Sequence, residues 1–207
     1  MDRVRTTTLR ADLTVLLAGA GIVDVDVDEA VEDEHVRSAA YRQVIAVVAA
    51  ARRRDDDRAV VSVILRDPEE LVSKAAVVEL VDRVAMRTAD PADFRQWATG
   101  LMPEVDRLTT DGHRGFLHRR VHDWTTYLTV MAGRTPAAAE LAGVTDWMQR
   151  RIAEESTSLP VLAMLTETGS TKKTRNIARN RARSRAVRDA LSADPGCGGP
   201  RPGTSLP

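Results

Sequence analysis

The chain contains little cysteine, few aromatic residues and almost no lysine. Its one cysteine, Cys197, cannot close a disulfide within the chain, and no Cys/His spacing predicts a structural zinc site. Only seven of the 207 residues are aromatic, whereas Ala, Val and Leu are abundant. Such a composition packs most easily as closely spaced helices. Apart from Lys74, Lys172 and Lys173, every basic residue is an arginine, and this excess alone predicts no phosphate chemistry.

Long hydrophobic runs are also missing. The longest apolar stretch, Val44 to Ala51, is far shorter than the roughly 20 residues that a membrane-spanning helix needs. The first ten residues are charged and rich in threonine, and they lack the apolar segment of a signal peptide. We therefore expect a cytoplasmic protein with no membrane part.

Charge is balanced over the whole chain but not along it. The 30 basic and 30 acidic residues cancel, yet residues 170–207 hold nine basic and two acidic residues, a net charge of +7. The first 169 residues therefore carry −7. A one-sided distribution of this kind bears on binding partners rather than on the fold.

Helix start and stop signals are frequent along the chain. Asp67-Pro68, Asp90-Pro91 and Thr135-Pro136 each place a capping side chain before a proline, which is typical of a helix start, and Ser158 with Pro160 predicts another. Helix ends or breaks are expected at Gly100, Gly112, Gly133 and Gly169. These signals predict helices at about 8–20, 29–53, 58–66, 68–88, 91–108, 113–132, 136–155, 159–168 and 171–191.

Apolar residues between these signals recur at helical spacing. The expected buried stripes are Leu117, Val121, Trp124, Leu128 and Met131; Leu71, Ala75, Val78 and Val81; and Leu141, Val144, Met148 and Ile152. Residues 22–27 alternate instead and predict a short extended connector. With short connections, the sequence predicts an all-α fold of stacked antiparallel helix pairs over residues 1–192. The Pro/Gly-rich residues 193–207 are expected to form a disordered tail.

Several segments share one pattern: a short apolar helix, a turn, and then a basic residue before small apolar residues. The segments are 59–65 with a turn at Asp67 and then 74–78, 159–165 with a turn at Gly169 and then 175–178, and 36–40 as a second half alone. This pattern resembles HEAT-type α-helical repeats over about a third of the chain. The resemblance implies a curved solenoid of helix pairs with an extended binding face. An irregular helical bundle is the alternative architecture.

The basic segment 172–188 is the main candidate for a binding site. Its apolar residues share one side, so it is expected to be an amphipathic helix with a cationic face. That face is suited to nucleic-acid phosphates, to an acidic protein partner, or to the chain's own acidic surface. The candidate contact residues are Lys172, Lys173, Arg175, Arg179, Arg181, Arg183, Arg185 and Arg188.

Seven acidic residues lie between positions 24 and 34. The Asp24-x-Asp26-x-Asp28 start is similar to a calcium-binding loop, but Glu29 stands where that loop needs glycine, and His35 replaces the final glutamate. We therefore expect these acids to favour the positive end of the helix that begins near residue 29. Pairing between 24–34 and 172–188, within one chain or between two copies in a homo-oligomer, is a further hypothesis.

Other chemically interesting residues fit simple structural roles. His118 and His122 lie one turn apart, but arginines surround them and the glutamate of a His-Glu-x-x-His zinc site is absent, so a solvated pair is expected rather than a metal site.

Trp97, Trp124 and Trp147 are expected in the core. An exposed tryptophan cluster would instead indicate a partner groove.

No catalytic constellation is evident. No serine lies in a nucleophile elbow, and Gly19-Ala20-Gly21 lacks the rest of a nucleotide-binding fingerprint. The sequence therefore predicts no catalytic, cofactor-binding or metal-ligating residue and no enzyme activity. It favours a helical binding or scaffold module that recognises a protein partner. The alternative is a nucleic-acid-associated protein that contacts phosphates through 172–188.

Overall fold

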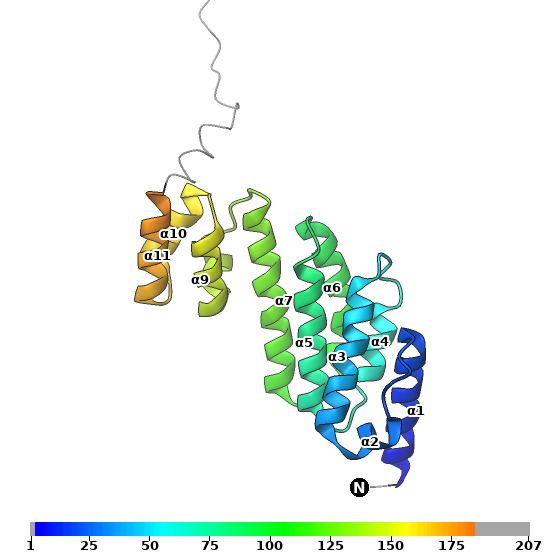
Figure 1. Cartoon of the computed structure of the whole chain (residues 1–207). Helices are drawn as coiled ribbons and strands as arrows, with labels where there is room; N and C mark the ends of the chain where they lie inside the picture. The colour runs from blue at the N-terminus through cyan, green and yellow to red at the C-terminus, as the bar shows by residue number, and fades with distance from the viewer. Residues whose placement is uncertain (1–2, 185–207) are drawn as a thin grey trace, which may run out of the picture. The chain divides into compact units, whose positions relative to one another are not determined.

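The structure, a computed structural model, describes residues 3–184. This part of the chain is all-α, as predicted, with no strand among its elements (Figure 1). Two compact units meet in the sequence between Ala132 and Gly133. Whether they form one domain over 1–192 stays a prediction. The helices are α1 (Arg3–Ala20), α2 (Val27–Glu32), α3 (Glu34–Ala50), α4 (Asp57–Ile64), α5 (Glu70–Ala85), α6 (Pro91–Val105), α7 (Asp111–Met131), α8 (Ala138–Gly143), α9 (Asp146–Glu155), α10 (Leu159–Thr168) and α11 (Lys172–Ala182).

Unit 1 contains two rows of helices. In one row α3 packs on α5 and α5 packs on α7; in the other, α1 packs on α4 and α4 packs on α6 (Figure 1). From α3 to α7, consecutive helices alternate between the rows, whereas the short α2 belongs to neither row. The largest fully buried side chains of this unit come from both rows: Leu13, Tyr41, Ile45, Ile64, Leu80, Phe94, Leu101, Leu117 and Trp124.

Unit 2 is built around α11, which packs on both α9 and α10. The predicted stripe Leu141, Val144, Met148 and Ile152 is buried along its whole length. Leu162 and Leu165 of α10 and Ala178 of α11 are also buried. This unit therefore has an apolar core of its own.

A polar contact recurs where the second helix of one pair meets the turn of the next pair. Arg37 of α3 donates from Nε to Oδ2 of Asp67, in the α4–α5 turn, at 2.8 Å. In unit 2, the backbone N–H of Ser170, in the α10–α11 turn, donates to Oε1 of Gln149 in α9 at 2.8 Å. Glu70 of α5 accepts instead, from the backbone N–H groups of the α6–α7 turn. These contacts position each turn against the preceding pair.

A second recurring contact fixes the start of three helices. The fourth residue of each is an arginine that donates to a backbone carbonyl six residues earlier. The pairs are Arg37 with Val31, Arg114 with Leu108, and Arg175 with Gly169. These bonds satisfy carbonyl groups at or just after the end of the preceding helix.

The predicted helix 29–53 is wrong, because the chain forms two helices there. Asp33 is extended, with φ −111° and ψ 118°, and separates α2 from α3. Its carboxylate accepts hydrogen bonds from the N–H groups of His35 and Val36. The acidic run therefore contains two helix starts rather than one, because Asp26 caps α2 and Asp33 caps α3.

The helix predicted at 136–155 is likewise divided, into α8 and α9, because Val144 and Thr145 are extended and Thr145 caps α9. Gly100 was expected to end or break a helix but lies inside α6. Asp67 was expected to cap a helix from Pro68, but α5 begins at Glu70. The predicted tail 193–207 lies outside the described residues.

Candidate functional site

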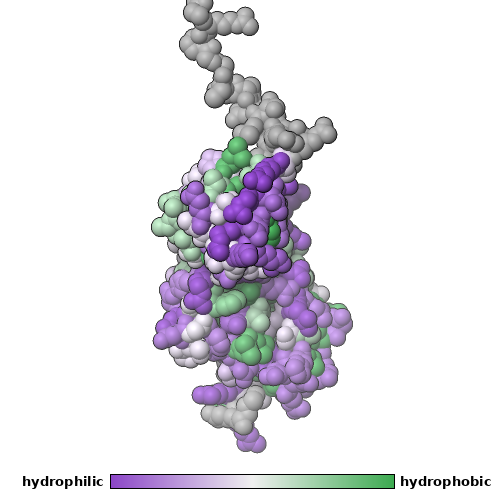
Figure 2. Space-filling view, turned by 90° about the vertical axis from the view of Figure 1, so that its left-hand side faces the viewer, coloured by the Kyte–Doolittle hydropathy of each residue, from purple (hydrophilic) through white to green (hydrophobic). Residues whose placement is uncertain are grey.

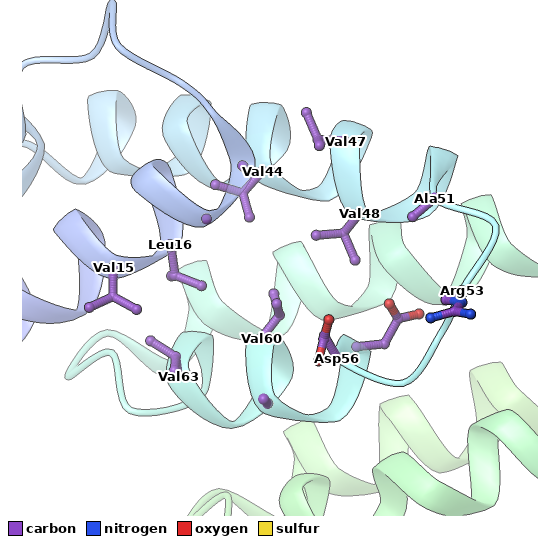
Figure 3. Close-up of a pocket in the computed structure, with 14 residues that line it drawn as sticks. Val15, Leu16, Val44, Val47, Val48, Ala51, Arg53, Asp56, Val60 and Val63 are labelled. Atoms are coloured by element: carbon purple, nitrogen blue, oxygen red, sulfur yellow. The ribbon is translucent and has the colours of Figure 1, made fainter.

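An apolar groove lies between α1, α3 and α4 of unit 1 (Figure 3). Its volume is about 430 Å³, which falls in the size range of ligand pockets. We call it the valine groove, because six valines line it: Val15 from α1, Val44, Val47 and Val48 from α3, and Val60 and Val63 from α4. Leu16 adds to the apolar wall, and Arg53 and Asp56 stand at one end (Figure 3).

The end of α1 leaves the groove open. Gly19 lines it without a side chain, and a Cβ attached there would meet no atom within 4 Å. Gly21, with φ +68°, ends the helix, and the N–H of Ile22 donates back to the carbonyl of Leu17 at 2.9 Å. The end of α1 thus combines a glycine that lines the groove without a side chain, Gly19, with a glycine that ends the helix, Gly21.

Two valines at the groove are exposed to solvent. Val15 is 64% exposed and Val47 is 46% exposed, although both line an apolar surface. Covering such side chains gains about 25 cal/mol per Å² of apolar surface removed from water. Covering the valine groove with a partner is therefore energetically favourable.

The polar end of the groove is held in place by hydrogen bonds. Asp57 is buried, and its Oδ2 accepts from Nε1 of Trp97 at 2.9 Å and from Nη1 of Arg54 at 3.4 Å. Burial raises the pKa of Asp57, and these two donors oppose the rise. Arg54 also donates to the carbonyls of Val48 and Ala49 at the end of α3. The loop between α3 and α4 is therefore fixed at both sides.

A second hollow of about 390 Å³ borders the same loop, lined by Arg54, Arg58, Gln96 and Trp97 among others. Trp97 is half-buried and contacts the Phe94 ring at 5.6 Å between centroids. Trp97 therefore departs from the expected core position. Trp124 is buried as expected, and its Nε1 donates to Asp82 at 2.7 Å. Trp147 also departs from the expectation, at 36% exposed.

The predicted basic residues of α11 separate into two groups. Lys172, Lys173, Arg179 and Arg183 are exposed. Arg175 and Arg181 are half-buried and donate to the carbonyls of Gly169 and Ser156. Arg185 and Arg188 lie outside the described residues. Figure 2, viewed toward α11, shows strongly hydrophilic side chains gathered over unit 2.

The acidic segment 24–34 has roles within unit 1. Asp26 and Asp33 cap helices, and Asp28 forms an ion pair with Arg10. Pairing of this segment with 172–188 stays a prediction. Two of the four histidines contact carboxylates: Nε2 of His118 lies 2.8 Å from Oδ1 of Asp106, and Nδ1 of His113 lies 3.2 Å from Oε2 of Glu70.

Across residues 3–184, no cluster of three or more His, Cys, Asp or Glu side chains is arranged to hold a metal ion. In the same range no helix is long and apolar enough to cross a membrane. Comparisons with family models, with curated proteins and with solved structures give no match.

Sequence reasoning missed the valine groove. Its three walls come from α1, α3 and α4, and each wall alone has the pattern of an ordinary amphipathic helix. One local signal was present: Val44, Val47 and Val48 form a valine-rich patch next to Ala51. Nothing in the sequence placed this patch opposite Gly19.

Proposed function

We propose that this protein is a helical binding module that holds an apolar segment of a protein partner in the valine groove. The observation that carries the proposal is the groove itself, an open apolar cleft with Val15 and Val47 exposed on its walls. Exposed apolar surface that is concave and bordered by charge is typical of protein interaction sites.

The partner segment is an amphipathic helix. All three walls of the groove are helices, whose backbone groups are paired within the helix, so they offer no strand edge to an extended peptide. Affinity must then come from side chains that enter the groove. A helix with apolar residues at positions i, i+4 and i+7 presents such side chains in a row. Its polar face would remain in water, beside Arg53 and Asp56.

The recurring contacts of the fold support a repeat architecture of the HEAT type. In the segments 36–40 and 175–178, the basic residue before the small apolar residues donates to the end of the preceding helix. Arg37 donates to the carbonyl of Val31 in α2, and Arg175 donates to the carbonyl of Gly169, directly after α10. Arg114 makes the same contact in a segment outside the original resemblance. Repeated helix pairs of this kind commonly present extended binding surfaces to partners.

The test is selection of binders from a displayed library of amphipathic helical peptides, with the full chain as target. We expect peptides with the i, i+4, i+7 apolar pattern and micromolar or better affinity. Gly19→Leu should weaken their binding at least tenfold, because the leucine fills the groove from an open position. Val15→Ser with Val47→Ser should weaken it similarly by removing apolar contact area.

Gly112→Leu is the matched control. A Cβ at Gly112 also meets no atom within 4 Å, and this residue lies in α7, which contributes no residue to the lining of the groove. Binding should be unchanged in this variant. Peptides that bind Gly19→Leu as tightly as the original chain, or a library that yields no binder at micromolar concentration, would overturn the proposal.

A further inference from the structure

We propose that the exposed face of α11 binds the phosphates of a nucleic-acid duplex. This inference concerns unit 2 and does not depend on the valine groove. The face consists of Lys172, Lys173, Arg179 and Arg183, with the amides of Asn176 and Asn180 between them. We call it the cationic face.

These residues share one side of the helix. Lys172, Asn176, Arg179 and Arg183 follow steps of four, three and four, which places them in one row. Thr174 and Ala178, on the opposite side, are buried. The cationic face therefore points away from the core of unit 2.

The four cations are available for a ligand. Within residues 3–184 none of them forms an ion pair with a carboxylate, and Arg179 bonds only to the amide oxygen of Asn176, at 3.1 Å. No acidic residue occurs between positions 172 and 184. The glutamates at the end of α9 pair with arginines of α9 itself. Charges left without partners in this way favour an anionic ligand.

The helix start adds to the positive potential. Most helices within residues 3–184 carry an acid in the first turn, but α11 has two lysines and no acid there. Positive side chains at the positive end of a helix repel its dipole, and a bound anion relieves that repulsion. The two inward-facing arginines, Arg175 and Arg181, tie α11 to carbonyls of unit 2. The cationic face is thus presented on a helix fixed at both ends.

The spacing favours a duplex. From position 172 to 183 the helix rises about 16 Å, at 1.5 Å per residue. Each strand of a duplex places a phosphate about every 3.4 Å along its axis, so about five phosphates per strand lie within that length. A membrane surface fits less well, because Asn176 and Asn180, rather than large apolar side chains, separate the cations.

The experiment measures binding of the full chain to a generic 20-base-pair DNA duplex from about 50 to 300 mM salt. Four phosphate contacts predict that the logarithm of the association constant falls with a slope of about −3.6 against the logarithm of salt. Affinity should then fall on the order of 10²-fold between 50 and 200 mM. The variant K172Q/K173Q/R179Q/R183Q should lose most of that slope and at least tenfold in affinity at 50 mM.

The control variant R42Q/R52Q/R95Q/R119Q removes the same charge from four exposed arginines of unit 1. Its salt slope should stay within about one unit of that of the original chain. A loss seen only in the α11 variant is then due to contacts of the cationic face and not to the overall charge of the protein. Circular dichroism verifies that both variants remain helical. No duplex binding at 50 mM, equal losses in the two variants, or binding to vesicles of anionic lipid in place of the duplex would overturn the inference.

Discussion

Gly19 and Gly21 lie two residues apart at the end of α1, and the backbone makes opposite demands on them. Gly19 is helical with open space beside it, whereas Gly21 has φ +68°, a conformation that side-chain-bearing residues avoid. Their substitutions by alanine should therefore change stability in opposite directions.

We expect Gly19→Ala to raise the free energy of unfolding by about 0.5 kcal/mol, because alanine loses less conformational entropy in a helix. Gly21→Ala should lower it by about 1 kcal/mol, since the left-handed conformation strains an L-residue. Urea unfolding of the two variants and the original chain measures both changes. Equal effects of the same sign would show that α1 does not end as described.

Asp67 shows how a residue in a turn acquires a structural role from distant partners. It is buried, pairs with Arg37, and accepts a hydrogen bond from the hydroxyl of Tyr41 at 2.8 Å. Burial, and then the charge of Asp67, raise the pKa of Tyr41 far above its ordinary value. The tyrosine thus stays protonated and continues to donate to the carboxylate.

At the scale of elements, Glu70 joins α5 to the α6–α7 turn. Its Oε1 accepts from the hydroxyl and the backbone N–H of Thr109, at 2.6 and 2.7 Å, and Oε2 accepts from the N–H of Thr110 at 3.2 Å. These hydrogen bonds lower the pKa of Glu70 from 4.5 to about 2. The folded chain therefore favours the ionised form more strongly than the unfolded chain does.

The lowered pKa predicts a pH-dependent contribution to stability. Because the folded value lies below the unfolded one, the contribution is complete above about pH 4.5 and is lost as the pH falls toward about 2. Glu70→Gln should lower the free energy of unfolding by about 1 kcal/mol at neutral pH, and the difference should shrink over that acidic range. Urea unfolding at several pH values measures it.

Glu69→Gln is the control for this prediction, since Glu69 is exposed and its side chain does not cap α5. It should leave the pH profile unchanged. His113, whose Nδ1 lies 3.2 Å from Glu70, stays in place in both variants. A difference between Glu70→Gln and the original chain that is the same at pH 2 and pH 7 would contradict the assignment.

At the scale of the whole molecule, the net charge is zero, yet the chain presents two chemically different surfaces, one apolar and one cationic. The valine groove belongs to unit 1 and the cationic face to unit 2, and each unit has its own buried core. Effects at sites without shared partners add nearly independently. The two proposed binding activities should therefore be separable.

We expect Gly19→Leu to leave the salt dependence of duplex binding unchanged. The variant K172Q/K173Q/R179Q/R183Q should likewise leave the affinity for a groove-binding peptide within about twofold, which corresponds to the usual error of additivity. Peptide titrations with and without saturating duplex measure any coupling directly. A change of tenfold or more in either affinity would show that the two surfaces communicate.

Local chemistry in the sequence was enough to determine much of the helical structure. Asp90-Pro91 starts α6 as predicted, because a capping carboxylate and a proline act within one turn. The stripe from Leu141 to Ile152 is buried as predicted, although the break at Val144 and Thr145 was missed. The all-α fold follows from signals of this short range.

Only the tertiary structure determined which faces of the helices are exposed to solvent. Leu71 and Ala75 fit a buried stripe by spacing, yet both are exposed, because α5 turns Ala76, Val77 and Leu80 toward its neighbours instead. Likewise, spacing does not distinguish the inward-facing Arg175 and Arg181 from the outward-facing lysines of α11. Helical periodicity reports which residues share a face, but the partner helices determine whether that face meets core or water. For this reason the valine groove, to which three helices each contribute one wall, emerged only from their packing.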